Sequence, residues 1–404
     1  MLSRNLPTVS PCPSRAEVLA FSLYMLSRRL WLSNPTAKVR PLFRPPLYRT
    51  TALVTLRCTY GTATSSKSAQ LAEQLEQGSR YALAKSITLV ESSRSDHRAL
   101  AQELLSTVLK RQKESKDAKP TFRIGLSGSP GVGKSTFIEA FGMYLLEQGH
   151  KVAVLAVDPS SSRTGGSILG DKTRMTELSR ADDAYVRPSP SRGTLGGVSD
   201  VARNTNEAII LCEAAGYDVT LVETVGVGQS ETMVAEMVDM FVLLVGPGGG
   251  DELQGLKKGI VELSDMVIVN KADGKLEDAA RSAAMDYTSA IKFLQSPSPL
   301  WKAKVVRVSS RNNIGIDKSW EIMKSYFDTM TAAHKLAEKR GAQRKVWMWR
   351  QITSELVDRL NGDENVKKHV AKLESQVFDG KMTSGQAADS VVDVFLNKVK
   401  ENKI

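Results

Sequence analysis

The eight residues from Gly128 to Ser135 read GSPGVGKS and fit the phosphate-binding pattern G-x-x-x-x-G-K-[ST] in full. Glycines let successive backbone N–H groups curl around a phosphate, and a helix beginning there points its positive end at the same anion. We expect Lys134 to bridge the β- and γ-phosphates and Ser135 to bind Mg²⁺. The predicted nucleotide-binding residues of this segment are Gly128, Ser129, Pro130, Gly131, Val132, Gly133, Lys134, Ser135 and Thr136.

A second motif, Asn270-Lys271-Ala272-Asp273, predicts which purine is bound. The carboxylate of Asp273 can accept hydrogen bonds from N1–H and the exocyclic amine of guanine, whereas adenine would leave it unpaired. We expect Asn270 to face the other edge of the base and the Lys271 stem to pack across its ring. A backbone N–H that reaches guanine O6 is expected from the segment after the last predicted strand, Ser309, Ser310 and Arg311.

Three carboxylates between these motifs are candidates for the magnesium shell and for polarising the attacking water. They are Asp158 in AVDPSS, Asp171 in GDKTRM and Glu223 in ETVG, and each could instead be a solvated loop acid. Gly226, which ends the E-x-x-G element, is expected to sense the γ-phosphate. Val227 follows it where Ras-like GTPases place a water-orienting glutamine. We therefore expect slow intrinsic GTP hydrolysis that a partner accelerates, with Lys134 and the three carboxylates as the catalytic residues.

The elements that must position these residues alternate between short apolar strands and amphipathic helices. Such continuous apolar strands predict an α/β fold of the P-loop NTPase type, whose mostly parallel sheet is covered by helices on both faces. Helical periodicity from Ser68 to Gln112 and after residue 330 predicts helical N- and C-terminal extensions. We predict boundaries at 1–66, 67–120, 121–330 and 331–404. The predicted strands are Phe122–Leu126, Val152–Val157, Val219–Val222, Met240–Val245, Met266–Val269 and Val305–Val308.

Most of the net charge of +11 lies at the start of the chain. Residues 1–66 hold nine basic side chains and a single acid, Glu17, so the remainder carries only +3. A net charge of +3 over the rest of the chain is too small to indicate a nucleic-acid-binding surface. An Arg-rich, acid-poor leader is typical of a mitochondrial transit peptide, the alternative being a basic tail that stays attached. We expect a location in the mitochondrial matrix and, since no apolar run approaches about 20 residues, no membrane partner.

The strings GSPGVGKST, AVDPSS, GDKTRM, ETVGVGQSE, GPGGGDELQG and NKAD occur here in the order that is typical of the MeaB-like GTPases. The resemblance covers about residues 70–404. It implies a GTPase that chaperones methylmalonyl-CoA mutase, gates delivery of adenosylcobalamin and helps to remove inactivated cofactor. It also implies a homodimer built through the C-terminal helices, and it makes the cobalamin adenosyltransferase a candidate partner. Mg²⁺ with GTP or GDP is the expected cofactor set, with no tightly bound organic cofactor.

Three alternatives stay open at this point. A bacterial group that shares these strings is named for lysine/arginine/ornithine transport kinase activity, so a P-loop kinase is one alternative. A nickel-insertion GTPase is the second, although its expected ligand clusters are missing because the four histidines and Cys212 are scattered. The third is a binding module that holds GTP without hydrolysing it. Val227 favours this alternative, because it stands where a water-orienting glutamine would promote hydrolysis.

Overall fold

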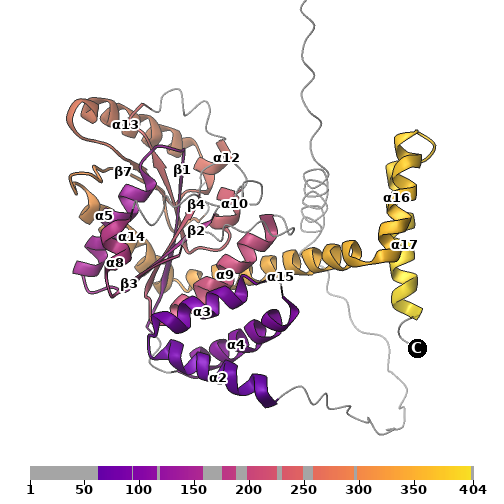
Figure 1. Ribbon diagram of the computed structural model, residues 1–404. Coiled ribbons are helices and arrows are strands. Elements are labelled where there is room, and N and C mark those ends of the chain that lie inside the picture. The colour runs from indigo at the N-terminus through magenta and orange to yellow at the C-terminus, as the bar shows by residue number, and fades with distance from the viewer. Residues whose placement is uncertain are drawn as a thin grey trace, which may run out of the picture. The chain divides into compact units, whose positions relative to one another are not determined.

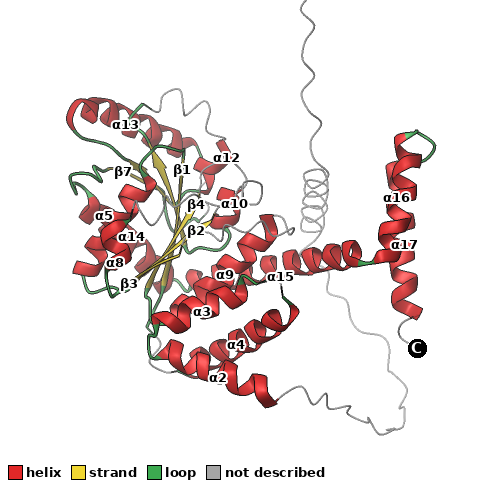
Figure 2. Cartoon of the chain, viewed as in Figure 1, coloured by secondary structure: helices red, strands yellow, loops and turns green. Residues whose placement is uncertain are grey.

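The computed structural model describes residues 62–92, 94–115, 119–157, 175–187, 198–224, 230–248, 258–294 and 298–401. At the centre of this part lies a seven-stranded, wholly parallel sheet with the strand order β3-β2-β4-β1-β5-β6-β7 (Figures 1 and 2). Its strands are β1 (Phe122–Gly128), β2 (Val152–Val157), β3 (Ala184–Arg187), β4 (Val219–Thr224), β5 (Met240–Val245), β6 (Met266–Val269) and β7 (Lys304–Arg307).

Helices cover both faces of the sheet, because successive strand residues point to opposite sides and both sides are apolar. In β2, Val152 and Val154 pack with α5, α8 and α14, whereas Ala153 and Leu155 pack with α9 on the other face. The second face is completed by α10, α12 and α13. The predicted fold class is therefore confirmed. These helices are α5 (Lys134–Glu147), α8 (Thr176–Arg180), α9 (Val198–Ala214), α10 (Ser230–Ala235), α12 (Lys258–Leu263), α13 (Glu277–Phe293) and α14 (Ile316–Ala332).

Strand β3 is absent from the sequence prediction. It has only four residues, lies at the edge of the sheet, and leaves Val186 and Arg187 partly exposed. A strand that short lacks the continuous apolar run from which the others were predicted. The last strand also begins at Lys304, one residue earlier than predicted, and ends at Arg307. Three predicted strands agree at both ends, and the first and third continue two residues further.

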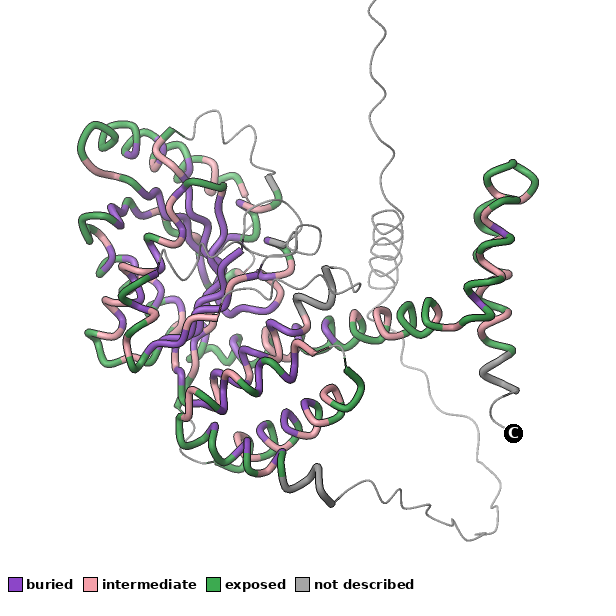
Figure 3. The backbone as a smooth tube through the Cα atoms, in the orientation of Figure 1, coloured by how far each residue is buried: buried purple, intermediate pink, exposed green. Residues whose placement is uncertain are grey.

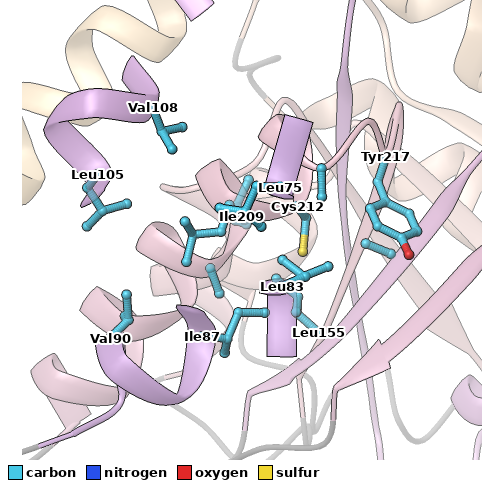
Figure 4. Packing of buried hydrophobic residues seen from close by; sticks show 14 of the residues in the cluster. Leu75, Leu83, Ile87, Val90, Leu105, Val108, Leu155, Ile209, Cys212 and Tyr217 are labelled. Carbon is cyan, nitrogen blue, oxygen red and sulfur yellow. The ribbon is translucent and has the colours of Figure 1, made fainter. Parts of the chain in front are cut away.

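The helical stretch predicted between 68 and 112 is divided into α2 (Thr62–Glu76), α3 (Arg80–Val90) and α4 (Ser95–Glu114). Gly78 follows the end of α2 and has a left-handed φ of 76°, which stops the helix from continuing. The hydroxyl of Ser79 then caps α3 by accepting from the amide of Ala82 at 3.3 Å. These helices do not form a core of their own. Figure 4 shows Leu75, Leu83 and Ile87 packing with Ile209 and Cys212 of α9 in a single buried cluster.

The C-terminal region consists of α15 (Lys335–Gly362), α16 (Glu364–Phe378) and α17 (Ser384–Glu401), of which the last two pack on each other. The first half of α15 is anchored below β1 and β5, where Arg340 binds the fully buried carboxylate of Asp239 at 2.7 and 2.5 Å. The second half differs. It exposes Trp349, Ile352 and Leu356 to solvent. Most of the tube of this half is coloured as exposed in Figure 3.

Within the described residues, none of the helices combines the length and apolar character that crossing a membrane requires.

Candidate nucleotide site

The glycine-rich loop lies between β1 and α5, at the carboxyl edge of the central strand. Gly131 and Gly133 have φ of 82° and 95°, in the left-handed region that favours glycine. A Cβ at Gly128 would lie 2.2 Å from the carbonyl oxygen of Leu244 on β5. The loop therefore passes so close to the neighbouring strand that a side chain has no room there, and α5 begins directly behind it at Lys134.

Lys134 is buried, and its ammonium donates to the carbonyl oxygens of Gly128 at 2.7 Å and Ser129 at 3.3 Å. Burial lowers the pKa of this lysine, since a charged ammonium loses hydration there. The negative charges of Glu223 and Glu231 act in the opposite direction and raise the pKa. Burial is the largest of these effects, so the pKa of Lys134 lies below its usual value, and the two carboxylates oppose the decrease only in part.

Ser135 and Glu223 lie side by side because β1 and β4 are neighbours, with Leu126 opposite Glu223. The Ser135 hydroxyl donates to Oε1 of Glu223 at 3.4 Å, and Glu223 is buried. A hydroxyl and a carboxylate are oxygen donors of the kind that Mg²⁺ prefers, so this pair fits the predicted metal role. Asp158 and Asp171, predicted for the same shell, and Gly226, predicted to sense the γ-phosphate, lie outside the described residues. Among the residues that are described, no cluster of three or more His, Cys, Asp or Glu forms a metal site.

The loop after β6 interlocks with the glycine-rich loop. The side-chain amide of Asn270 donates to the carbonyls of Val132 at 3.1 Å and Gly133 at 3.4 Å, and Lys271 Nζ donates to the carbonyl of Gly131 at 2.7 Å. Lys271 itself has φ 60°, a left-handed conformation. That Asn270 faces the base stays a prediction. In the structure, its amide ties the loop after β6 to the glycine-rich loop.

A third loop, after β7, completes this arrangement. The Oδ1 of Asn270 accepts from the amide of Ser310 at 3.3 Å and from its hydroxyl at 2.7 Å. Asn312 donates to Oδ2 of Asp273 at 3.2 Å, so the carboxylate that we predicted to read guanine has an orienting partner. Ser309 is fully buried and pairs with Ile314, which closes the turn, while Arg311 is exposed.

Two residues near the site were missed in the sequence. Asn312 follows Ser309-Ser310-Arg311 directly, and no motif distinguishes it from its neighbour Asn313. Glu231 is only 2% exposed and stands in the first turn of α10. In the sequence, Glu231 is the last residue of ETVGVGQSE, and an acidic residue is common in the first turn of a helix, so nothing there marks it as part of a site. Only the packing of α10 reveals that it is buried close enough to influence Lys134.

The parallel sheet, the glycine loop at its central strand and the Asn-Lys-x-Asp loop beside it define a P-loop nucleotide-binding protein. A family model described as methylmalonyl Co-A mutase-associated GTPase MeaB matches residues 83–365. The chain therefore belongs to the MeaB family, and it is a GTPase.

Individual relatives agree with this family assignment. The chain is 52% identical over 328 residues to the mouse protein named methylmalonic aciduria type A homolog, mitochondrial, which covers 80% of this chain and 78% of that protein. The chain is 46% identical over 301 residues to GTPase ArgK of Escherichia coli, and the match covers 74% of this chain and 88% of that protein. A crystal structure of a protein named LAO/AO transport system kinase superposes with a TM-score of 0.64 at 34% identity, covering 82% of this chain and 98% of that chain.

Gly133→Ala is expected to destabilise the nucleotide-free protein more than Gly131→Ala. Both positions have left-handed φ, which costs a residue with a side chain about 1–2 kcal/mol. A Cβ at 133 would also lie 2.7 Å from Nδ2 of Asn270, whereas at 131 nothing lies within 4 Å. Displacing that amide leaves the Val132 carbonyl without its donor, at a further cost of about 1–3 kcal/mol. Urea denaturation measures the difference, and equal losses in the two variants would contradict it.

Proposed function

We propose that this GTPase is a chaperone of methylmalonyl-CoA mutase that gates loading of adenosylcobalamin and protects or reactivates the mutase. The observation that carries the proposal is the match of residues 83–365 to a family described as mutase-associated. The 52% identity to a mouse protein named for methylmalonic aciduria supports it independently. The cobalamin adenosyltransferase is a further proposed partner, as the supplier of the same cofactor.

In the proposed hydrolysis site, residues of the glycine loop bind the phosphates, and Glu223 at the end of β4 helps to hold Mg²⁺. Lys134 neutralises charge on the β- and γ-phosphates, a role supported by its buried ammonium at the centre of the loop. Ser135 and Glu223 would hold Mg²⁺ from their adjacent positions. Bound Mg²⁺ supplies charge neutralisation of the γ-phosphate during transfer. Asp158 and Asp171 are proposed to complete this shell, and Gly226 to contact the γ-phosphate.

The base is proposed to lie against the loops after β6 and β7. Asp273 accepts from N1–H and the exocyclic amine of guanine, and the amide of Asn312 orients this carboxylate from behind. Ser310, which holds the side chain of Asn270, comes from the segment proposed to reach guanine O6. Nucleotide selection thus depends on a carboxylate fixed by a neighbouring amide, since an unpaired acceptor penalises adenine.

The proposed homodimer is supported by the second half of α15. Trp349 is 64% exposed and Leu356 is 53% exposed, on a helix that otherwise carries many charges. Large apolar side chains gathered on an exposed helix face are typical of an interaction surface. Sedimentation of the purified protein as a single chain at micromolar concentration would contradict the dimer.

A mitochondrial matrix location is proposed from the Arg-rich segment 1–66 and from relatives in mouse and Caenorhabditis elegans that are named mitochondrial. The predicted transit peptide lies outside the described residues. Retention in the cytosol of a fluorescent protein fused to residues 1–66 would contradict the proposal.

The alternative of a transport-type kinase has one observation in its favour, since the superposable crystal structure is that of a protein named LAO/AO transport system kinase. A kinase transfers the γ-phosphate to an acceptor, whereas a GTPase releases it to water. Recovery of labelled γ-phosphate as inorganic phosphate, in the presence of lysine, arginine or ornithine, distinguishes the two activities.

Asp273→Asn is expected to shift base preference from guanine toward xanthine. An asparagine amide donates where the carboxylate accepted, and xanthine offers a carbonyl where guanine has its amine. Competition of GDP with XDP for the protein measures the shift, which we expect to reach on the order of 10²-fold or more. Asp278→Asn, at an exposed position on α13, is the matched control. Unchanged guanine preference in Asp273→Asn would contradict the proposed base-reading role.

GTP turnover is expected to be slow alone and to rise on the order of tenfold or more when methylmalonyl-CoA mutase is added, because a partner can supply the missing water-orienting or cationic group. Multiple-turnover phosphate release, with and without the mutase, measures it. Lys134→Ala serves as the inactive control. If the mutase neither stimulates turnover nor forms a complex, the chaperone proposal is wrong and the GTPase assignment is unaffected.

A further inference from the structure

The pairing between β1 and β4 ends just before the glycine loop begins. Leu126 and Glu223 are the last residues that the two strands pair with each other. One residue further along, Ser127 still pairs with β5 and Thr224 still pairs with β2. At the carboxyl edge of the sheet, the central strand and β4 thus each remain paired on their outer side, while the backbone ladder between them has ended.

A pair of side-chain hydroxyls joins the two strands at this point. The hydroxyl of Thr224 donates to the hydroxyl oxygen of Ser127 at 3.0 Å. Thr224 is 0% exposed and Ser127 is 1% exposed, so bulk water does not compete for this bond. Since a buried hydroxyl that loses its partner is costly, the bond holds the end of β4 to the residue that precedes the first glycine of the loop.

The hydroxyl pair and Glu223 lie on opposite faces of the sheet, because successive residues of a strand alternate in direction. Gly125, two residues before Ser127, faces α10, since a Cβ there would lie 2.8 Å from a side chain of that helix. The hydroxyl pair therefore lies on the α10 face. Glu223 lies on the α5 face, where its Oε1 accepts from the Ser135 hydroxyl at 3.4 Å. The pair can thus hold β4 without occupying the proposed metal side of the strand.

We propose that Thr224 and Ser127 are positioning residues for magnesium binding, because their hydroxyl pair sets the distance between Glu223 and Ser135. Glu223 precedes Thr224 directly in the chain, so a shift of the strand end moves both residues. Mg²⁺ requires near-ideal octahedral geometry with oxygens at about 2.0–2.1 Å, and it therefore tolerates little displacement of a ligand. The inference rests on the proposed role of Glu223 in holding Mg²⁺ and not on the mutase proposal.

The contacts that shape the glycine loop do not involve either hydroxyl. Lys134 donates to the carbonyls of Gly128 and Ser129, and Asn270 donates to the carbonyl of Val132. Loss of the hydroxyl pair is therefore expected to leave the binding of GDP without Mg²⁺ intact and to weaken the binding of Mg²⁺ to the GDP complex. A general loss of structure would lower both.

Thr224→Val and Ser127→Ala test the proposal, because each removes one hydroxyl of the pair with little change in volume. The Kd for Mg²⁺ is measured by titrating the protein–GDP complex with MgCl₂ in a calorimeter. It is expected to rise on the order of tenfold in each variant, as is typical when a contact that supports a metal ligand is lost. The Kd for GDP in EDTA is expected to stay within about twofold, and Thr224→Ser, which keeps the hydroxyl, is expected to retain the natural Mg²⁺ affinity.

Thr220→Val is the matched control. Thr220 lies on the same face of β4 and is 1% exposed, but its hydroxyl has no hydrogen-bond partner within the described part of the chain. The same substitution there is expected to leave the Mg²⁺ affinity unchanged. The double variant Thr224→Val with Ser127→Ala is expected to lose no more affinity than either single variant, because the two hydroxyls form one bond.

Unchanged Mg²⁺ affinity in Thr224→Val and Ser127→Ala would overturn the proposal, and so would losses that add up in the double variant. A loss of GDP affinity in EDTA as large as the loss of Mg²⁺ affinity would overturn it too. Glu223→Gln is measured alongside: if this variant keeps full Mg²⁺ affinity, the metal role of Glu223 is wrong and the inference fails with it. A loss in Glu223→Gln alone means that the hydroxyl pair does not position the carboxylate. Should Thr224→Val not fold, Ser127→Ala decides, since it leaves β4 unaltered.

Discussion

The buried ammonium of Lys134 is the constraint around which the rest of the site is arranged. A cation removed from water is costly unless negative charge and hydrogen-bond acceptors replace its hydration. The carbonyls of Gly128 and Ser129 do so within the loop, and the carboxylates of Glu223 and Glu231 do so from β4 and α10. Charge compensation thus requires three segments, far apart in sequence, to meet at one edge of the sheet.

The parallel sheet satisfies this requirement because all of its strands end at the same edge. Strand β1 delivers the glycine loop, its neighbour β4 delivers Glu223, and β6 and β7 deliver the two loops beside the proposed base position. Asn270 then connects the parts, since its amide binds the glycine loop while its carbonyl oxygen binds Ser310. One side chain therefore couples the geometry of the glycine loop to that of the loop after β7.

The terminal helices are part of the hydrophobic core that includes the sheet. α3 and α4 pack on α9, so their buried leucines share one cluster with β2. α15 has a double character: its first half binds the polar groups below β1 and β5, and its second half exposes large apolar side chains. A single helix thus joins the amino ends of the central strands to an exposed apolar surface. The predicted domain boundaries at 66, 120 and 330 remain predictions.

The sequence by itself determined the fold class and the two nucleotide motifs, because continuous apolar strands, fixed glycine spacing and Asn-Lys-x-Asp are local signals. It also located most of the net charge in residues 1–66. Only the tertiary structure decided what Asn270 contacts, that Asn312 contacts Asp273, that Glu231 is buried, and that the edge strand β3 exists. The physical reason is the same in each case: those properties arise from contacts between segments distant in sequence, and burial, partner and orientation leave no mark in local residue spacing.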